Sequence, residues 1–366
     1  MIVDEKFNDY FKNIKQVFLY IIDECNLDCI QCLYKPNNYF YLKNKEINYD
    51  TAKNLLLHMC SLGAMKLTIM GGEPTLYGRD QQWRPLLGLI RYSKEIGYDY
   101  VRIDTNGTFD SKILYESDFK LLDEITFSID GPTAEINDEI RGKGSFIKCT
   151  QNIKEAIKIG YNCNITCCIH KNLIQRDMYG NLYLDNMILF AQNIGISRIN
   201  FHDLFKAGLP RDAWTGNIDI SIKEWFDVWD EIQHKILKGY YKIPVRIPQS
   251  FVIPERFYSN QKYYGYCSAK LGDRALIHPD GIIRVCSLTI GTPYGVAKYY
   301  KNKIVWDESD TNELCNHVME EMTPCTHQSK SNKYSPFLPV CVSFKPQQDE
   351  YVWNKLEWEK TRQDEG

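Results

Sequence analysis

The stretch Cys25-Asn26-Leu27-Asp28-Cys29-Ile30-Gln31-Cys32 places three cysteines at a Cys-x3-Cys-x2-Cys spacing. It follows an apolar run from Val17 to Ile22, which predicts a buried β-strand with the cysteines in the loop after its carboxyl end. Thiolate sulfurs bind iron-sulfur clusters, and close spacing lets one short loop reach several irons. Because three thiolates leave one iron of a four-iron cluster without a protein ligand, the pattern indicates a cluster that binds a small molecule.

Two other uses of clustered cysteines fit this chain less well. Structural zinc sites take four ligands, commonly in two Cys-x2-Cys pairs, and the sequence has no second pair. Disulfide frameworks are typical of short exported proteins, whereas this chain has 366 residues and shows no export signal. The sequence therefore favours an iron-sulfur cluster over both.

Composition restricts the class of protein further. The length suits one barrel-sized domain and a smaller one. The net charge is -3 without a basic run, so nucleic acid is not an expected partner. No apolar run is long enough to span a bilayer, and thirteen cysteines without an export signal indicate a reducing compartment. We therefore expect a cytoplasmic protein with no membrane partner.

A second motif follows the next predicted strand, residues 66–70, which runs into Gly71-Gly72-Glu73-Pro74. Glycines after a strand let the backbone approach a ligand closely, and proline fixes the exit of the chain. The cysteine loop and this turn, in this order, resemble the radical S-adenosylmethionine (SAM) superfamily. The resemblance implies that the three cysteines hold a [4Fe-4S] cluster and that Gly71, Gly72, Glu73 and Pro74 receive the amino group of SAM.

Strands alternate with helices through the first two thirds of the chain. We predict strands over residues 17–22, 66–70, 100–104, 124–129, 163–169 and 198–201, with a helix in each interval; the first helix is capped at Asp50 or Thr51. This order predicts a parallel sheet whose carboxyl strand ends form one rim, where such folds place their chemistry. The resemblance implies a partial (β/α)6 TIM-like barrel. Periodicity alone also allows a closed eight-unit barrel or an open doubly wound sheet.

Further SAM contacts are implied by a second resemblance. Residues 130–133 and 140–146 are similar to a segment of the SPASM/twitch branch of the superfamily, which implies that Ser128, Asp130 and Arg141 contact SAM. Asp130 before Gly-Pro also fits an ordinary turn residue. Asn106 is placed to face the ribose of SAM, although Asn-Gly is itself a common turn.

Other cysteines and histidines lie near the predicted strand ends. Cys163 and Cys167 share one strand face and Cys168 lies on the other, and we interpret all three as core packing, like Cys149 on the preceding helix. His170 and His202 are candidates for a base or a substrate contact.

The C-terminal region predicts a second metal site. Cys267 is followed after thirteen residues by Gly281 and after four more by Cys286, around a predicted hairpin over residues 276–286. This pattern resembles the opening of a SPASM/twitch domain, but the later cysteines are too few for two clusters. The resemblance then implies one auxiliary [4Fe-4S] cluster held by Cys267, Cys286, Cys325 and Cys341, with Cys315 spare in a helix; free thiols in a small β-subdomain are the alternative.

The predicted domain organisation follows from these segments. Residues 1–239 form the α/β radical SAM partial barrel, and 240–266 a bridging segment rich in proline and aromatic residues. Residues 267–345 form a small α+β SPASM/twitch-type cluster domain, and 346–366 a polar tail.

The resemblance implies reductive cleavage of SAM to a 5′-deoxyadenosyl radical that abstracts a hydrogen atom from substrate. The expected substrate is a residue of a ribosomally synthesised peptide, to be crosslinked, oxidised or epimerised. About sixteen residues precede the first strand, so either the core of the protein or a separate protein would recognise the leader peptide. A reducing donor such as flavodoxin or ferredoxin is a further expected partner.

Two alternatives remain open at this stage. One is a small-molecule dehydrogenase or rearrangement enzyme, for example on a sugar alcohol. The other is a non-catalytic iron-sulfur protein for electron transfer or sensing, which would need neither an open iron nor the Gly71–Pro74 turn.

Overall fold

The computed structural model describes residues 1–32, 46–202, 218, 220, 222–247, 272–287 and 295–307. Its strands form one sheet in the order β1-β12-β11-β10-β9-β2-β3-β4-β5-β6-β7-β8. From β2 to β8 every neighbouring pair is parallel. These strands are β2 (Gln16–Tyr20), β3 (Lys66–Met70), β4 (Tyr100–Thr105), β5 (Glu124–Ser128), β6 (Cys163–Cys168), β7 (Arg198–His202) and β8 (Val245–Arg246).

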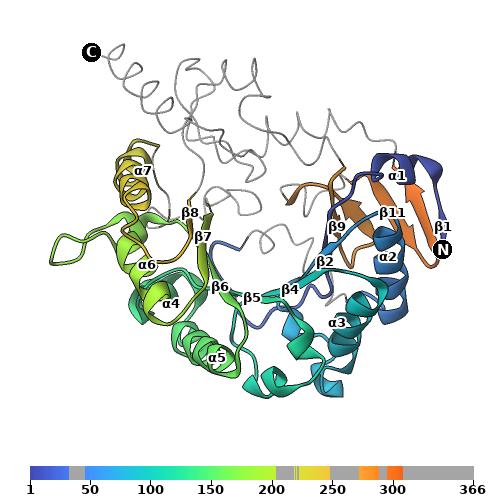
Figure 1. Cartoon of the computed structure of the whole chain (residues 1–366), viewed down its shortest axis with the longest axis horizontal. Helices are drawn as coiled ribbons and strands as arrows, with labels where there is room; N and C mark the ends of the chain where they lie inside the picture. The colour runs from blue at the N-terminus through green and yellow to red at the C-terminus, as the bar shows by residue number, and fades with distance from the viewer. Residues whose placement is uncertain are drawn as a thin grey trace, which may run out of the picture.

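The described helices that follow the parallel strands cover the convex side of this curved sheet (Figure 1). They are α2 (Tyr49–Ser61), α3 (Arg84–Ile96), α4 (Ala134–Arg141), α5 (Ser145–Ile159), α6 (Tyr183–Asn193) and α7 (Ile222–Leu237). The parallel strands follow one another in chain order with these helices on one side, which is a barrel-like arrangement rather than a doubly wound one. Among the described strands the sheet is open, because β8 stands at its end and β2 pairs with β9 instead.

The two faces of the sheet differ in polarity because side chains alternate along each strand. On β4, Val101 and Ile103 are fully buried in the core shared with the helices. Arg102 and Asp104 point to the other, concave side, where they form an ion pair. The same alternation on β5, β6 and β7 gives an apolar convex layer and a polar concave face.

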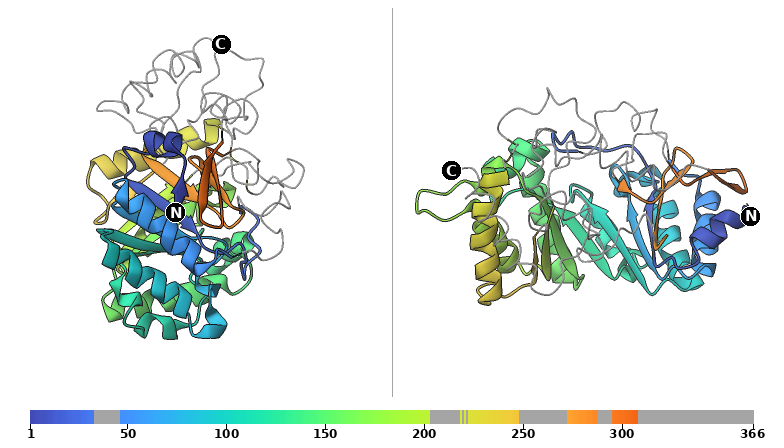
Figure 2. Two further views of the ribbon diagram at one scale, coloured as in Figure 1. Left: turned by 90° about the vertical axis from the view of Figure 1, so that its right-hand side faces the viewer. Right: turned by 90° about the horizontal axis from the view of Figure 1, so that it is seen from above.

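The C-terminal strands extend the sheet past β2. Strand β9 (Arg274–Ile277) runs parallel to β2, and β10 (Ile282–Arg284), β11 (Ala297–Tyr300) and β12 (Lys303–Trp306) continue it with antiparallel pairs. Strand β1 (Ile2–Val3) pairs with β12, which Figure 2 shows as blue beside orange, and α1 (Glu5–Tyr10) follows it. The first and last described strands are therefore neighbours.

Most of the predicted elements are confirmed, including the six strands and the hairpin made by β9 and β10. The expected helix between β4 and β5 is wrong, since that interval holds two 3-10 turns, η3 (Ser111–Tyr115) and η4 (Phe119–Leu121). The predicted cap of α2 is also wrong: Asn48 caps it, accepting a hydrogen bond from Thr51 N, and this side chain satisfies a backbone donor that the first turn leaves free. Strand β8 lies in the segment predicted as a bridge.

In the described part of the chain, none of the helices has the length and apolar character needed to cross a membrane. The helix predicted around Cys315 lies outside the described residues.

Candidate functional site

The cysteine loop begins directly after β2 and crosses the carboxyl ends of the neighbouring strands. Its three cysteines are partly exposed. Burial, together with the charges on Glu73, Cys29 and Cys32, raises the pKa of Cys25 to about 12. The three thiols are thus near enough to interact, and a bound cation would be needed to favour the thiolate form of Cys25.

The Gly71-Gly72 turn lies against the chain that leads into this loop. Gly72 N donates to Ile22 O at 2.7 Å and Glu73 N donates to Glu24 O at 2.8 Å. A Cβ atom at Gly72 would overlap the carbonyl oxygens of both Asp23 and Glu24. Glycine is required here because the two backbones run side by side without room for a side chain.

Glu73 is fully buried and joins the ends of β3 and β4. Its Oε1 accepts hydrogen bonds from Thr75 N at 3.1 Å, Thr75 Oγ1 at 2.6 Å and Thr105 Oγ1 at 2.8 Å. Its Oε2 accepts from Asn106 N at 2.8 Å. Burial raises the pKa of Glu73, and these donors oppose that rise because they favour the ionised carboxylate.

Asn106 connects this carboxylate to the cysteine loop. Its Nδ2 donates to Asn26 Oδ1 at 2.8 Å and stands 3.7 Å from Cys25 Sγ, within reach of a hydrogen bond to sulfur. Its Oδ1 accepts from Thr108 N at 2.8 Å, which fixes the orientation of the amide. The side chain is therefore a rigid N–H donor toward the first cysteine.

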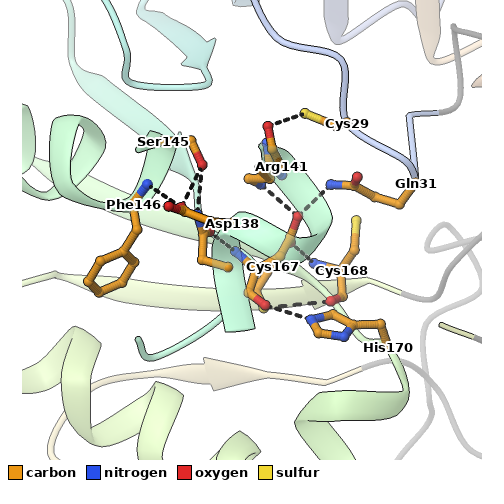
Figure 3. Close-up of polar contacts among 11 residues, drawn as sticks. Cys29, Gln31, Asp138, Arg141, Ser145, Phe146, Cys167, Cys168 and His170 are labelled. Atoms are coloured by element: carbon orange, nitrogen blue, oxygen red, sulfur yellow. Dashed lines mark hydrogen bonds and ion pairs between the residues drawn. The ribbon is translucent and has the colours of Figure 1, made fainter. Parts of the chain in front are cut away.

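Asp130 holds the other end of the loop, and Figure 3 shows three of its neighbours, Gln31, Arg141 and Cys168, close together. Its Oδ2 accepts from Gln31 Nε2 at 2.5 Å and pairs with Arg141 Nε at 2.6 Å, while its Oδ1 accepts from Cys168 N at 2.6 Å. The carboxylate is fully buried. It joins the cysteine loop, the end of α4 and the end of β6 at one point, and we call Gln31, Asp130 and Arg141 the clamp.

Arg141 is buried beside the second cysteine. Its carbonyl oxygen lies 3.8 Å from Cys29 Sγ, and Ile30 N donates to the preceding carbonyl, Ile140 O, at 3.0 Å. Burial opposes the charge of the guanidinium, but Asp130 and the nearby thiols hold its pKa above the usual range. A permanent positive charge next to the thiols favours anionic ligands in this place.

The remaining predicted residues lie around the same rim. Ser128 ends β5 on the concave side. His170 is buried with Nε2 2.6 Å from Asp130 O, and burial lowers its pKa. His202 ends β7 on the concave side, where burial and the charge of Arg102 lower its pKa to about 4. Both imidazoles are neutral near pH 7.

The cysteines of β6 divide between the two faces. Core packing is confirmed for Cys163 and Cys167, and for Cys149 on α5. It is wrong for Cys168, which lies outside that core. Burial raises the pKa of its thiol, and the charges of Asp130, Cys29 and Cys32 add to the rise, so Cys168 is close to the cysteine loop. Gln31 and Cys168 are thus site residues that the sequence prediction missed. The sequence held one signal for each: Gln31 stands between two cysteines of the loop, and Cys168 lies on the opposite strand face from Cys163 and Cys167.

The second predicted metal site is only partly described. Cys286 follows β10 and is 9% exposed. Cys267, Cys325 and Cys341 lie outside the described residues. Within the described part, no three His, Cys, Asp or Glu side chains are grouped to hold a single metal ion. A cluster differs from a single ion, since each of its thiolates binds a different iron.

Comparison with known proteins agrees with this geometry. Residues 19–178 match the family model of the Radical SAM superfamily. Curated relatives include a probable GTP 3',8-cyclase of Saccharolobus islandicus, 25% identical over 267 residues that cover 72% of this chain and 79% of the relative. Another probable GTP 3',8-cyclase, from Sulfurisphaera tokodaii, is 26% identical over 206 residues, covering 56% of this chain and 60% of that protein.

Solved structures share the fold at low sequence identity. Streptococcus suis SuiB bound to its precursor peptide SuiA has a TM-score of 0.58 at 14% identity, covering 80% of this chain and 64% of SuiB. This chain therefore spans less than two thirds of that protein. The enzyme anSMEcpe with bound SAM has a TM-score of 0.57 at 16% identity, covering 94% of this chain and 96% of the other.

Proposed function

We propose that this chain is a radical SAM enzyme, which its family match and its fold support, and that it abstracts a hydrogen atom from a residue of a ribosomally synthesised peptide. The observation that carries the proposal is the attachment of the cysteine loop to three strand ends. Glu73, Asn106 and Asp130 are buried polar residues, and together they hold the loop at the rim where parallel α/β folds place chemistry.

The residues present fit a [4Fe-4S] cluster and SAM. Cys25, Cys29 and Cys32 would hold the cluster, because one loop carries all three thiols and the Asn106 amide offers a donor to the first of them, Cys25. Hydrogen bonds to sulfur are a common means of tuning such clusters. When bound, the two cofactors supply the 5′-deoxyadenosyl radical, and the protein supplies orientation and the exclusion of water.

The turn 71–74, Asn106, Ser128, Asp130 and Arg141 would bind SAM. The half-buried Gly71 and Gly72 offer backbone groups, and the Arg141 guanidinium offers a positive charge for a carboxylate. The oxygens of Glu73 and Asp130 already accept hydrogen bonds from the protein, so we assign both mainly to placing their neighbours. Asp130 would act through Arg141, and Glu73 through Asn106.

The peptide substrate is supported by the kind of protein that shares this fold. SuiB was solved with a precursor peptide, and anSMEcpe was solved with peptides as well as with SAM. We further propose one auxiliary [4Fe-4S] cluster held by Cys267, Cys286, Cys325 and Cys341, which would accept the electron left on an oxidised substrate. The first cluster would be reduced by a flavodoxin or ferredoxin, and a separate protein would deliver the peptide leader.

A second candidate is a small-molecule rearrangement. The curated relatives favour it, since they are named as probable GTP 3',8-cyclases and the Saccharolobus islandicus protein matches 72% of this chain. Substrate-dependent formation of 5′-deoxyadenosine separates the two candidates, because only the true substrate increases it when GTP and candidate precursor peptides are compared.

The first test is iron content and SAM cleavage after anaerobic reconstitution. The native chain is compared with a variant in which Cys25, Cys29 and Cys32 are all Ala, and with Cys60→Ala, a thiol on α2 away from the site, as control. We expect about eight irons in the native and control proteins, about four in the triple variant, and 5′-deoxyadenosine from the first two only. Cleavage by the triple variant would refute the assignment. If the triple variant binds no iron, the proposed auxiliary cluster is absent, and redox-neutral chemistry becomes the better interpretation.

A further inference from the structure

The concave face of the sheet carries polar side chains in two adjacent layers. Strand register places Asp104, Thr126, Asn164 and Arg198 side by side across β4, β5, β6 and β7. The next layer toward the rim consists of Ser128, Thr166 and Asn200. We call these seven residues the polar wall; Asn200 stands level with Ser128, which we assign to SAM.

Two amide oxygens of the polar wall are buried without a partner among the described residues. They are Asn164 Oδ1 and Asn200 Oδ1, and the Asn164 side chain is 1% exposed. Asn164 uses its amide nitrogen to donate to Glu124, so its oxygen is free to accept. Leaving such an acceptor unpaired costs about 1–3 kcal/mol, so a donor outside the described residues is expected at each.

The charges beside these oxygens are already neutralised. Arg102 Nε lies 3.0 Å from Asp104 Oδ1, and Arg198 Nη2 lies 3.1 Å from Glu124 Oε1. Two cations and two anions therefore balance on this face, and Thr126 Oγ1 adds a hydrogen bond of 2.8 Å to Glu124 Oε1. Both guanidiniums on these strands are already in ion pairs, so a strongly anionic ligand such as a triphosphate would compete with a carboxylate. A neutral amide instead meets the two unpartnered amide oxygens, and its carbonyl group can accept from Arg102 Nε and Arg198 Nε, which donate no hydrogen bond within the described residues.

We propose that Asn164 and Asn200 bind backbone N–H groups of the peptide substrate and so position the residue that loses its hydrogen atom. The two asparagines lie diagonally on neighbouring strands, about 6–7 Å apart along the strand direction and about 5 Å apart across it. An extended peptide that runs along the strands presents N–H groups on one side at that same spacing along its length. This inference deepens the proposed function and rests on it, because it names the chemistry by which that site recognises substrate.

The test is binding of neutral and anionic probes to the full chain, reconstituted anaerobically and saturated with SAM. The probes are N-acetyl-triglycine methylamide, myo-inositol and GTP, followed by saturation-transfer NMR titration. Asn200→Leu removes the acceptor at nearly constant size, and Asn193→Leu, at the exposed end of α6, is the matched control. Where the leucine variant does not give a native-like thermal melt, Asn200→Ala replaces it.

We expect the capped peptide to bind the native and control chains and to lose about tenfold in affinity with Asn200→Leu, the effect of one missing hydrogen bond. Equal binding by native chain and variant would overturn the proposal. So would binding of GTP that depends on Asn200, or no binding by any probe, which would leave ordered water as the partner of both oxygens. Failure of the native chain to form 5′-deoxyadenosine refutes the proposed function instead, and is measured separately.

Discussion

Replacing Asp130 by Asn tests the clamp that holds the cysteine loop. The amide keeps the shape of the carboxylate but removes its charge, so the buried Arg141 guanidinium loses the partner at 2.6 Å. One of the two side-chain positions also becomes an N–H donor, which then faces either Cys168 N or the Gln31 and Arg141 donors. Removing one partner of a buried ion pair costs about 3–5 kcal/mol, and we expect a loss of unfolding free energy in that range.

The assay is equilibrium urea unfolding of the metal-free chain under reducing conditions. Asp80→Asn is the control, because Asp80 is 94% exposed and its pair with Arg79 should contribute only about 0–1 kcal/mol. Arg141→Met and the double variant complete a cycle. Removing both charges leaves no unpaired ion, so the double variant should be more stable than the sum of the single effects by at least about 1 kcal/mol. An Asp130→Asn loss below about 1 kcal/mol, or strict additivity, would refute this view of the clamp.

Two further predictions concern the rim and its pH response. Gly72→Ala should lower iron incorporation and should reduce the free energy of unfolding more than Gly160→Ala does. The Cβ atom at position 72 would meet the backbone of Glu24, whereas the one at position 160 meets no atom of the described residues and costs only about 1–2 kcal/mol because of the positive φ there. Equal losses in urea unfolding would contradict the close approach. His202 has a folded pKa of about 4, below its unfolded value, so the metal-free chain should lose stability as pH falls from about 6.5 toward 4, by at most about 3 kcal/mol from this group. His202→Gln should flatten that part of the stability profile, and an unchanged slope would show that the imidazole is already solvated.

The sequence predicts the parallel strands well because their signal is local. Runs such as Cys163–Cys168 combine β-propensity with burial on one face, and each is bounded by turn residues. The position of both motifs at one rim follows from parallel topology alone, so the approach of Gly72 to the cysteine loop needed no long-range information. The helix predicted between β4 and β5 was wrong because local signals alone were used: the interval is long enough for a helix, and only its packing decides in favour of 3-10 turns.

The clamp could not be predicted in the same way. Gln31 and Asp130 are 99 residues apart, and neither belongs to a periodic pattern that would bring them together. Cys168 was misassigned because alternation fixes which face a residue occupies but not which face is the core. The two asparagines of the polar wall have the same difficulty, since a polar residue in a strand is normally taken as solvent-exposed.

A motif in the sequence identifies which residues gather at a site, but not which of their atoms remain available to a ligand. Glu73 and Asp130 would be natural ligands for a cationic group if their carboxylates were free, yet both are surrounded by protein donors. Buried carboxylates that accept several hydrogen bonds hold their neighbours in place, since moving them would leave several donors unpaired. The Asn106 amide is occupied in the same way, by Asn26, Cys25 and Thr108. Ligand recognition at this rim then falls to the glycine backbone and the Arg141 guanidinium. Conservative replacement of Glu73 or Asp130 should therefore change the position of the cysteine loop more than it changes the groups that contact SAM.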